Sequence, residues 1–288
     1  YKNFFRSSKG AKNVGFPKFK SKRQNRDTYR TFNVDIDFDT KRIKLPKIGK
    51  IKYKNKEVKE WFRSAIPKNV TVSRVPSGKY FASILFEADD KPVVKTRGDK
   101  VIGLDMSLQN FYVDSLGNTP QYVRQYRKYE SKLAFLQKSL SRKPKGSNNR
   151  RKQRVKVARL YEKIINYRKD FVEKQSLNLV QEYDVIVVEN LSLQGMSQSL
   201  NLGKSVMDTG YSLFVKRLQD KAEELGKEIV LADKWFASSK TCHTCGYINK
   251  SLLLQEREWQ CPMCNTNHNR DINAAKNLEA VGRTVLAC

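Results

Sequence analysis

Four cysteines near the end of the chain constrain the fold more than any other feature of the sequence. They form two C-x-x-C pairs separated by fifteen residues, Cys242 with Cys245 and Cys261 with Cys264. This spacing is typical of a zinc ribbon, in which four thiolates hold one tetrahedral Zn²⁺ ion. Because four protein ligands leave no open position on the ion, we expect this site to be structural rather than catalytic. Cys288 is left over, and we expect it to be a bystander.

The size and hydropathy of the chain are those of a water-soluble protein. Its 288 residues are 39% hydrophobic, which is enough for one large core or two smaller ones. No apolar run approaches the ~18 residues of a membrane helix, and no signal peptide opens the chain. We therefore expect a protein of the prokaryotic cytoplasm, associated with the nucleoid, where disulfides are disfavoured. Since the first residue is Tyr1 rather than Met, we expect a fragment or a trimmed product.

The positive charge is concentrated in two segments. The formal net charge is +28, and residues 1–100 hold 27 Lys and Arg against 10 Asp and Glu. Residues 121–170 hold 17 against 3, while the rest of the chain is close to neutral. A generally basic surface is the simpler alternative, but two dense blocks beside a near-neutral remainder favour binding to a polyanion. We expect that partner to be nucleic acid.

Two stretches are candidates for the nucleic-acid contacts. Residues 1–30 interleave basic side chains with Phe and Tyr, which suits phosphate contact combined with base stacking. A disordered basic tail is the alternative. The second stretch, "SRKPKGSNNRRKQR" at 141–154, is a basic break between two helical patterns. The side chains that we expect to bind nucleic acid are Lys18, Lys20, Lys22, Arg23, Arg150, Arg151, Lys152 and Arg154.

The order of hydrophobic patterns predicts an α/β protein behind a small β-rich domain. Residues 28–95 carry short β-type runs, which predict an antiparallel sheet or barrel. From Lys100 the pattern changes to a strand pair, helices over 121–181, a strand at 183–193, a helix over 211–225 ended by Gly226, and a strand at 227–235. Strands alternating with helices predict a layered sheet with partly parallel pairing.

Three acidic residues stand at the ends of these elements. Asp105 and Glu189 each end an apolar strand, and Asp271 opens the helical pattern after the ribbon. Taken singly, each is typical of a turn or a helix cap. Three carboxylates at one end of a sheet repel each other unless cations lie between them, as when two Mg²⁺ ions are held for phosphodiester cleavage. We therefore predict that all three are magnesium ligands and catalytic residues.

The chain resembles a known family. The segments "GLDMSLQNFYVDS", "VIVVENLSLQGM" and "SSKTCHTCGYIN...WQCPMCNTNHNRDINAAKNL" look like the OrfB/TnpB proteins of insertion sequences, relatives of the type V CRISPR effector nucleases. The resemblance covers most of the chain. It implies an RNase H-like (RuvC) core over 100–240 with a helical hairpin insert at 121–181. It also implies a zinc ribbon at 241–266, a closing helix at 267–288, and a preceding basic β-barrel-like wedge domain at 1–99 that is truncated at its N-terminus.

The resemblance also implies a function in transposition and DNA recombination. The expected enzyme is a Mg²⁺-dependent, RNA-guided DNA endonuclease with a two-metal mechanism, whose guide RNA comes from the transposon end and whose catalytic acids are Asp105, Glu189 and Asp271. One alternative is a nuclease-inactive, RNA-guided DNA-binding repressor or transposition accessory protein. Another is a zinc-ribbon nucleic-acid protein without a guide. Two positions depart from the family pattern: Glu173 replaces a frequent His, and Asn269 replaces a frequent Asp.

The remaining expectations concern the surroundings of the ribbon. His268 lies three residues before Asp271, and either catalytic assistance or a capping or metal-supporting role fits that position. Trp235, Phe236 and Trp259 are expected to pack around the ribbon.

Overall fold

The computed structural model describes residues 27–54, 61–87, 98–191, 208–233, 235–253 and 255–287. The chain divides into two compact units, Tyr1–Asp90 and Lys91–Cys288. In the described part of the chain, no helix is long and apolar enough to cross a membrane.

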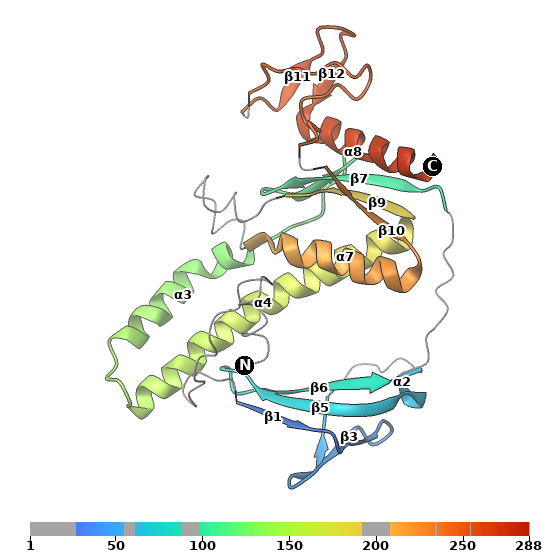
Figure 1. The fold of residues 1–288 in the computed structure, drawn as a ribbon. Coiled ribbons are helices and arrows are strands. Elements are labelled where there is room, and N and C mark those ends of the chain that lie inside the picture. Colours follow the sequence, from blue (N-terminus) through green and yellow to red (C-terminus); the bar gives the residue numbers. More distant parts are fainter. Residues whose placement is uncertain are drawn as a thin grey trace, which may run out of the picture. The chain divides into compact units, whose positions relative to one another are not determined.

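The first unit contains two three-stranded antiparallel sheets (Figure 1). One has the order β1-β5-β6 and the other β2-β3-β4. Their bounds are β1 Thr28–Thr31, β2 Asp35–Asp37, β3 Arg42–Leu45, β4 Gly49–Lys52, β5 Ile66–Arg74 and β6 Tyr80–Glu87, with a four-residue helix α2 at Trp61–Ser64. The predicted antiparallel strands are confirmed, but the described residues of this unit form no closed barrel.

A small apolar core joins these two sheets. Ile43 and Leu45 of β3 are buried together with Val70 of β5. Strand alternation explains the pattern, because β3 reads exposed-buried-exposed-buried and its charged residues face outward. The two sheets therefore pack against each other rather than closing into one.

The second unit is built on a four-stranded mixed sheet with the order β10-β9-β7-β8. The strands are β7 Val101–Ser107, β8 Phe111–Asp114, β9 Val185–Glu189 and β10 Glu228–Ala232. β8 pairs antiparallel with β7, whereas β9 is parallel to both β7 and β10. The predicted partly parallel α/β layer is thus confirmed.

Helices cover both faces of this sheet, α4 Asn148–Glu182 and α7 Tyr211–Leu225 on one face and α8 Arg270–Ala287 on the other (Figure 1). Helix α3 Gln125–Ser141 packs on α4 and not on the sheet. Ile186 and Val188 of β9 face a core shared with α4 and α7, while Val185 and Val187 face α8. Strands buried on both faces are continuous apolar runs, which is why "VIVV" shows no alternation.

Helix α8 lies unusually close to the sheet. A Cβ atom added at Gly103 of β7 would come within 2.0 Å of the Ala275 carbonyl oxygen, and one at Gly282 of α8 would come within 2.6 Å of Val187. Both positions therefore require glycine. The close packing fixes the start of α8, and with it Asp271, relative to the ends of β7 and β9.

The basic break between the helical patterns is shorter than predicted. α3 ends at Ser141 and α4 begins at Asn148, so the second half of the segment 141–154 is helical. Ser147 is the N-cap of α4, because its hydroxyl accepts a hydrogen bond from the Arg150 amide at 3.2 Å.

Candidate active site and candidate metal centre

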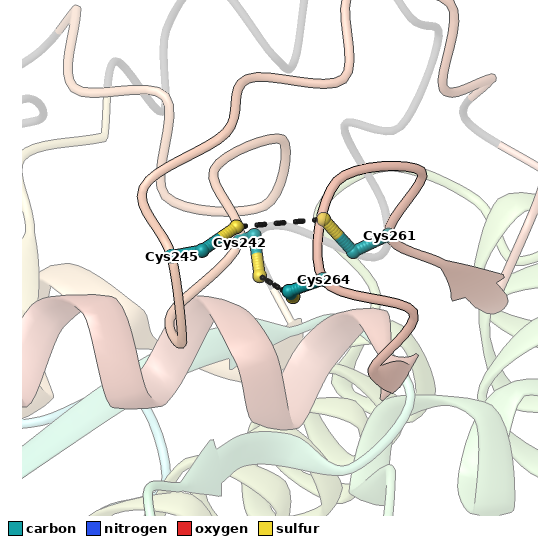
Figure 2. Close-up of side chains that lie close together, drawn as sticks. All are labelled: Cys242, Cys245, Cys261 and Cys264. Atoms are coloured by element: carbon teal, nitrogen blue, oxygen red, sulfur yellow. Dashed lines mark hydrogen bonds between the residues drawn. The ribbon is translucent and has the colours of Figure 1, made fainter.

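The four cysteine sulfurs face one another from two loops (Figure 2). All four Sγ atoms lie within 4.8 Å of one another, and the pairs Cys242–Cys264 and Cys245–Cys261 are 3.6 Å apart. These distances are far longer than a disulfide bond. They approach the S···S separation of about 3.8 Å that a tetrahedron with Zn–S bonds of about 2.3 Å requires. The cluster could therefore hold a metal ion, and four thiolates suit zinc.

A two-stranded hairpin, β11 (Glu258–Gln260) with β12 (Asn267–Asn269), supports this cluster. Trp259 of β11 is buried against Cys242 and Cys261, as predicted. Its register partner His268 is also buried, and its Nε2 atom lies 3.1 Å from Cys242 Sγ. Burial, together with the charges of His243 and Lys276, lowers the pKa of His268. The contact with a cysteine favours a metal-supporting role for His268 over catalytic assistance.

Two asparagines of α8 attach the helix to the base of the ribbon. The side-chain amide of Asn277 donates to the carbonyl oxygens of Ser238 at 2.7 Å and Thr241 at 2.6 Å. Asn273 donates to Thr241 O at 2.7 Å and accepts from the His243 amide at 3.0 Å. The ribbon and the helix that carries Asp271 therefore share one hydrogen-bond network.

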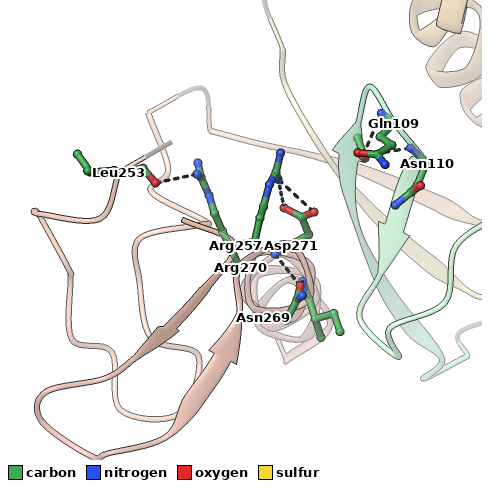
Figure 3. A network of polar contacts seen from close by, with 9 residues as sticks. Gln109, Asn110, Leu253, Arg257, Asn269, Arg270 and Asp271 are labelled. Atoms are coloured by element: carbon green, nitrogen blue, oxygen red, sulfur yellow. Dashed lines mark hydrogen bonds and ion pairs between the residues drawn. The ribbon is translucent and has the colours of Figure 1, made fainter. Parts of the chain in front are cut away.

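Asp271 lies in the first turn of α8 without capping it (Figure 3). The cap is Asn269, whose Oδ1 accepts from the backbone amides of Asp271 at 3.1 Å and Ile272 at 3.2 Å. The Asp271 carboxylate instead accepts from Arg257 of the ribbon at 2.9 Å. The departure Asn269 thus has a structural role, and it leaves the Asp271 carboxylate available for other contacts.

Asp105 and Glu189 lie on the neighbouring parallel strands β7 and β9. Leu104 of β7 pairs with Val188 of β9, and the two acids follow directly. Glu189 ends β9 as predicted, but the prediction that Asp105 ends its strand is wrong, because β7 continues to Ser107 through its pairing with β8. Burial raises the pKa of Asp105 well above its usual range, and the charges of Glu189 and Asp271 raise it further. The three predicted acids are therefore close enough to interact electrostatically.

Ser238 and Tyr211 hold Glu189, and sequence reasoning missed both contacts. The Ser238 hydroxyl donates to Glu189 Oε1 at 2.7 Å, and the Tyr211 hydroxyl donates to the Glu189 carbonyl oxygen at 2.8 Å. Burial raises the pKa of Glu189, while the Ser238 hydrogen bond and Arg270 oppose the rise. Both partners come from segments distant in sequence, so no local sequence pattern indicates these contacts.

The carboxylates are less tightly gathered than the cysteines. Three or more His, Cys, Asp or Glu side chains could hold one ion where their ligand atoms lie close enough together. Among the described residues, the four cysteines meet this condition, and the three acids do not. The guanidinium group of Arg257 forms an ion pair with the Asp271 carboxylate at 2.9 Å. A shared ion pair between the three acids stays a prediction.

The side chains predicted to bind nucleic acid differ in their surroundings. Arg150 bridges the helical hairpin, because its guanidinium donates to the carbonyl oxygens of Leu140 at 2.7 Å and Lys143 at 2.8 Å. The next three basic side chains on α4 are exposed and stay candidates: Arg151, Lys152 and Arg154. Four others lie outside the described residues: Lys18, Lys20, Lys22 and Arg23.

Two aromatic residues that were predicted to pack around the ribbon lie at the surface. Trp235 is 83% exposed, so the prediction is wrong for this residue, and Phe236 is 36% exposed. Glu173, the other departure from the family pattern, joins α4 to α7 through ion pairs with Arg217 at 2.7 Å and Lys221 at 2.5 Å.

Known families match most of the chain. Residues 83–200 match the OrfB_IS605 family, described as "Probable transposase", and residues 211–278 match "Cas12f1-like, TNB domain". The "Putative RNA-guided DNA endonuclease" of Streptomyces pristinaespiralis is 33% identical over 292 residues, covering 100% of this chain and 69% of the relative. "Putative RNA-guided DNA endonuclease InsQ" of Escherichia coli (strain K12) is 33% identical over 304 residues, covering 100% of this chain and 72% of the relative.

Among solved structures, the chain is similar to the protein in "Cryo-EM structure of the Cas12f1-sgRNA-target DNA complex". The TM-score is 0.51 at 17% sequence identity, over 75% of this chain and 46% of that chain. At this identity the likeness shows a shared fold, a Cas12f1-like mixed α/β architecture.

Proposed function

This chain belongs to the OrfB/TnpB family of insertion-sequence proteins, and we propose that it acts as an RNA-guided DNA endonuclease. The names of its relatives support this class of activity, as do the sgRNA and target DNA in the complex of its structural neighbour. In this proposal the guide RNA comes from the end of the transposon, and the protein works on DNA in the nucleoid.

The observation that carries the proposal is the placement of Asp105 and Glu189 on the adjacent parallel strands β7 and β9, with Asp271 in the first turn of α8. Burial raises the pKa of Asp105, and the charges of Glu189 and Asp271 raise it further, so its ionised form is costly without compensating cations. A purely structural role would favour separated or paired acids. The strand order β10-β9-β7-β8, with one acid on each of the central strands β7 and β9 and the third on α8, supports an RNase H-like (RuvC) core.

The carboxylates fit divalent cations by their chemistry. Hard oxygen ligands with excess negative charge are those that Mg²⁺ prefers. Two Mg²⁺ ions bound there would supply an activated water and a stabilised leaving oxygen for hydrolysis of a DNA phosphodiester bond. Ser238 keeps Glu189 oriented and favours its ionised form, since the hydroxyl donates to the carboxylate.

The four cysteines in this proposal hold a structural zinc ion rather than a catalytic one. Cys242 and its three partners would complete the coordination of the ion and leave no position for substrate. The ribbon then stabilises the start of α8 through Asn273 and Asn277.

The test is cleavage of a target DNA by the purified protein with an RNA from the end of its insertion sequence. Asp105→Ala, Glu189→Ala and Asp271→Ala should each lower the Mg²⁺-dependent rate by roughly 10³-fold, since metal assistance contributes several kcal/mol. RNA and DNA binding should persist. Asp233→Ala is the matched control, because this exposed acid directly follows β10. A wild-type protein that binds target without cutting it would support the repressor alternative instead.

A further inference from the structure

A pocket of about 230 Å³ lies where α4 meets the starts of α3 and α7. Its lining includes Tyr122, Gln125, Arg168, Phe171, Lys174 and Asp208. It shares no residue with the carboxylate site or the cysteine cluster. The volume is below the 300–1,000 Å³ of clefts for drug-sized ligands, so it suits a single small ring system.

Two residues that line this pocket each carry a buried hydrogen-bond acceptor that has no partner among the described residues. Asp208 is 4% exposed, and its Oδ1 accepts from the Tyr126 amide at 3.0 Å, which caps α3. In the described part of the chain, no donor reaches its Oδ2 atom or Oε1 of Gln125. Buried polar atoms are nearly always paired, so two unpaired acceptors in one cavity indicate a ligand that donates hydrogen bonds.

Aromatic rings form a wall of the same pocket. The rings of Tyr122 and Phe171 lie 5.1 Å apart, and Phe111 packs against them at 5.2 and 4.9 Å. Such a wall is poorly suited to a metal ion, but it suits stacking with a flat ring. A planar group with N–H donors on its edge would satisfy both features.

Basic side chains from a positively charged segment border the cavity. Arg168 lines it beside Gly210, where an added Cβ atom would come within 2.8 Å of the arginine side chain. Lys174 lines it as well, in an ion pair with Asp170 at 2.7 Å. Most of the lining residues lie in the segment 121–170, which holds 17 Lys and Arg against 3 Asp and Glu. A ligand that carries a phosphate therefore fits the surroundings.

We propose that this pocket binds one unpaired guanine base of a nucleic-acid strand. Guanine presents two adjacent donors, N1–H and N2–H, to two acceptors, whereas adenine, cytosine and uracil place an acceptor beside their donor. Single-stranded bases are read in this way, by stacking on aromatic rings and by hydrogen bonds to the Watson–Crick edge. The inference rests on the proposed function in taking nucleic acid as the partner.

The test compares fluorescently labelled single-stranded nonamers by anisotropy with the whole chain. The wild type should bind UUUUGUUUU about tenfold more tightly than an all-uridine nonamer, the size of effect that one stacked and hydrogen-bonded base gives. Inosine in place of guanine lacks the N2 amino group and should lose most of this preference. The matching deoxynucleotide series distinguishes RNA from DNA as the source of the base.

Asp208→Asn isolates the carboxylate. The amide keeps an oxygen for the Tyr126 amide but turns Oδ2 into a donor, so the guanine preference should vanish while binding of the all-uridine strand is unchanged. Asp170→Asn is the matched control, since this exposed acid also lines the pocket and pairs with Lys174. Equal affinity of the wild type for all nonamers, or a preference that survives Asp208→Asn, would overturn the inference and leave the proposed nuclease standing. No binding to any strand would count against both.

Discussion

The cysteine cluster and the carboxylate cluster both gather anionic side chains, but they are assembled over very different lengths of chain. The four cysteines lie between positions 242 and 264, on two turns joined to one hairpin. The three acids come from two strands and a helix that are far apart in sequence. The cysteines meet through local structure, whereas the acids meet only when the sheet and α8 have packed.

The two clusters also differ in how completely their own side chains could surround a metal ion. The cysteine sulfurs already lie at distances that suit one ion, while the acids are coupled electrostatically and are partly compensated by Arg257 and Arg270. A cluster closed by its own ligands suits a structural ion, and an open one suits an ion that must also contact substrate. The network through Ser238, Asn273 and Asn277 joins the two.

The largest expected effect comes from breaking the closed cluster. Cys245→Ser should abolish stoichiometric zinc binding, since structural zinc contributes about 10–16 kcal/mol in small zinc domains. The hairpin and the start of α8 should lose hydrogen-exchange protection, and cleavage should fall with them. Zinc analysis by mass spectrometry of fresh, reduced protein provides the measurement, and Cys288→Ser is the control. Wild-type protein with no zinc would refute the structural assignment.

The link between the clusters gives the next effect. Ser238→Ala removes a hydrogen bond to a charged group, worth about 1.5–3 kcal/mol, so the cleavage rate should fall at least tenfold. Because the bond favours the ionised carboxylate, its loss should raise the pKa of Glu189 and move the acidic limb of the pH–rate profile to higher pH. Ser239→Ala is the neighbouring control. An unshifted limb would mean that Ser238 acts only through packing.

The open cluster should be a source of instability without metal. The pKa of Asp105 is raised in the folded state, so ionisation of this group destabilises the fold as the pH rises above the usual range of aspartate and through the raised value. At neutral pH without added Mg²⁺, and with the ribbon zinc kept in place, Asp105→Asn should therefore raise the melting temperature, by roughly 2–4 °C. Mg²⁺ should stabilise the wild type more than this variant. A variant that melts lower than wild type in the absence of Mg²⁺ would contradict the electrostatic coupling.

The smallest effect concerns the arginine that reaches from one cluster to the other. The Arg257 side chain is 64% exposed, so its pair with Asp271 should contribute no more than about 1 kcal/mol. Arg257→Gln removes a positive charge beside the acids and should lower the Mg²⁺ concentration needed for half-maximal thermal stabilisation by roughly two- to fivefold. Arg283→Gln, which breaks another exposed pair, should leave that midpoint unchanged.

The order of elements could be predicted because it depends on local signals. The helix Tyr211–Leu225 ends where Gly226 adopts a left-handed conformation, φ 68°, and the sequence placed both correctly. Of the two forms predicted for residues 28–95, an antiparallel sheet or a barrel, the described residues form antiparallel sheets without a closed barrel. Short apolar runs could not decide between these forms, because sheet closure depends on pairing between distant strands. Trp235 was misplaced for a related reason, since an aromatic residue near a metal motif carries no information about which way its side chain faces.

The amino-acid sequence by itself determined the cysteine cluster, the helices and strands, and the three acids as candidates, because each is set by spacing or periodicity within a short stretch. The tertiary structure decided what those residues contact. Arg150 bridges two helices, Ser238 holds Glu189, and Arg257 pairs with Asp271. Such contacts arise where elements distant along the chain pack together. Their geometry depends on the whole sheet and its helices, which no local pattern of residues specifies.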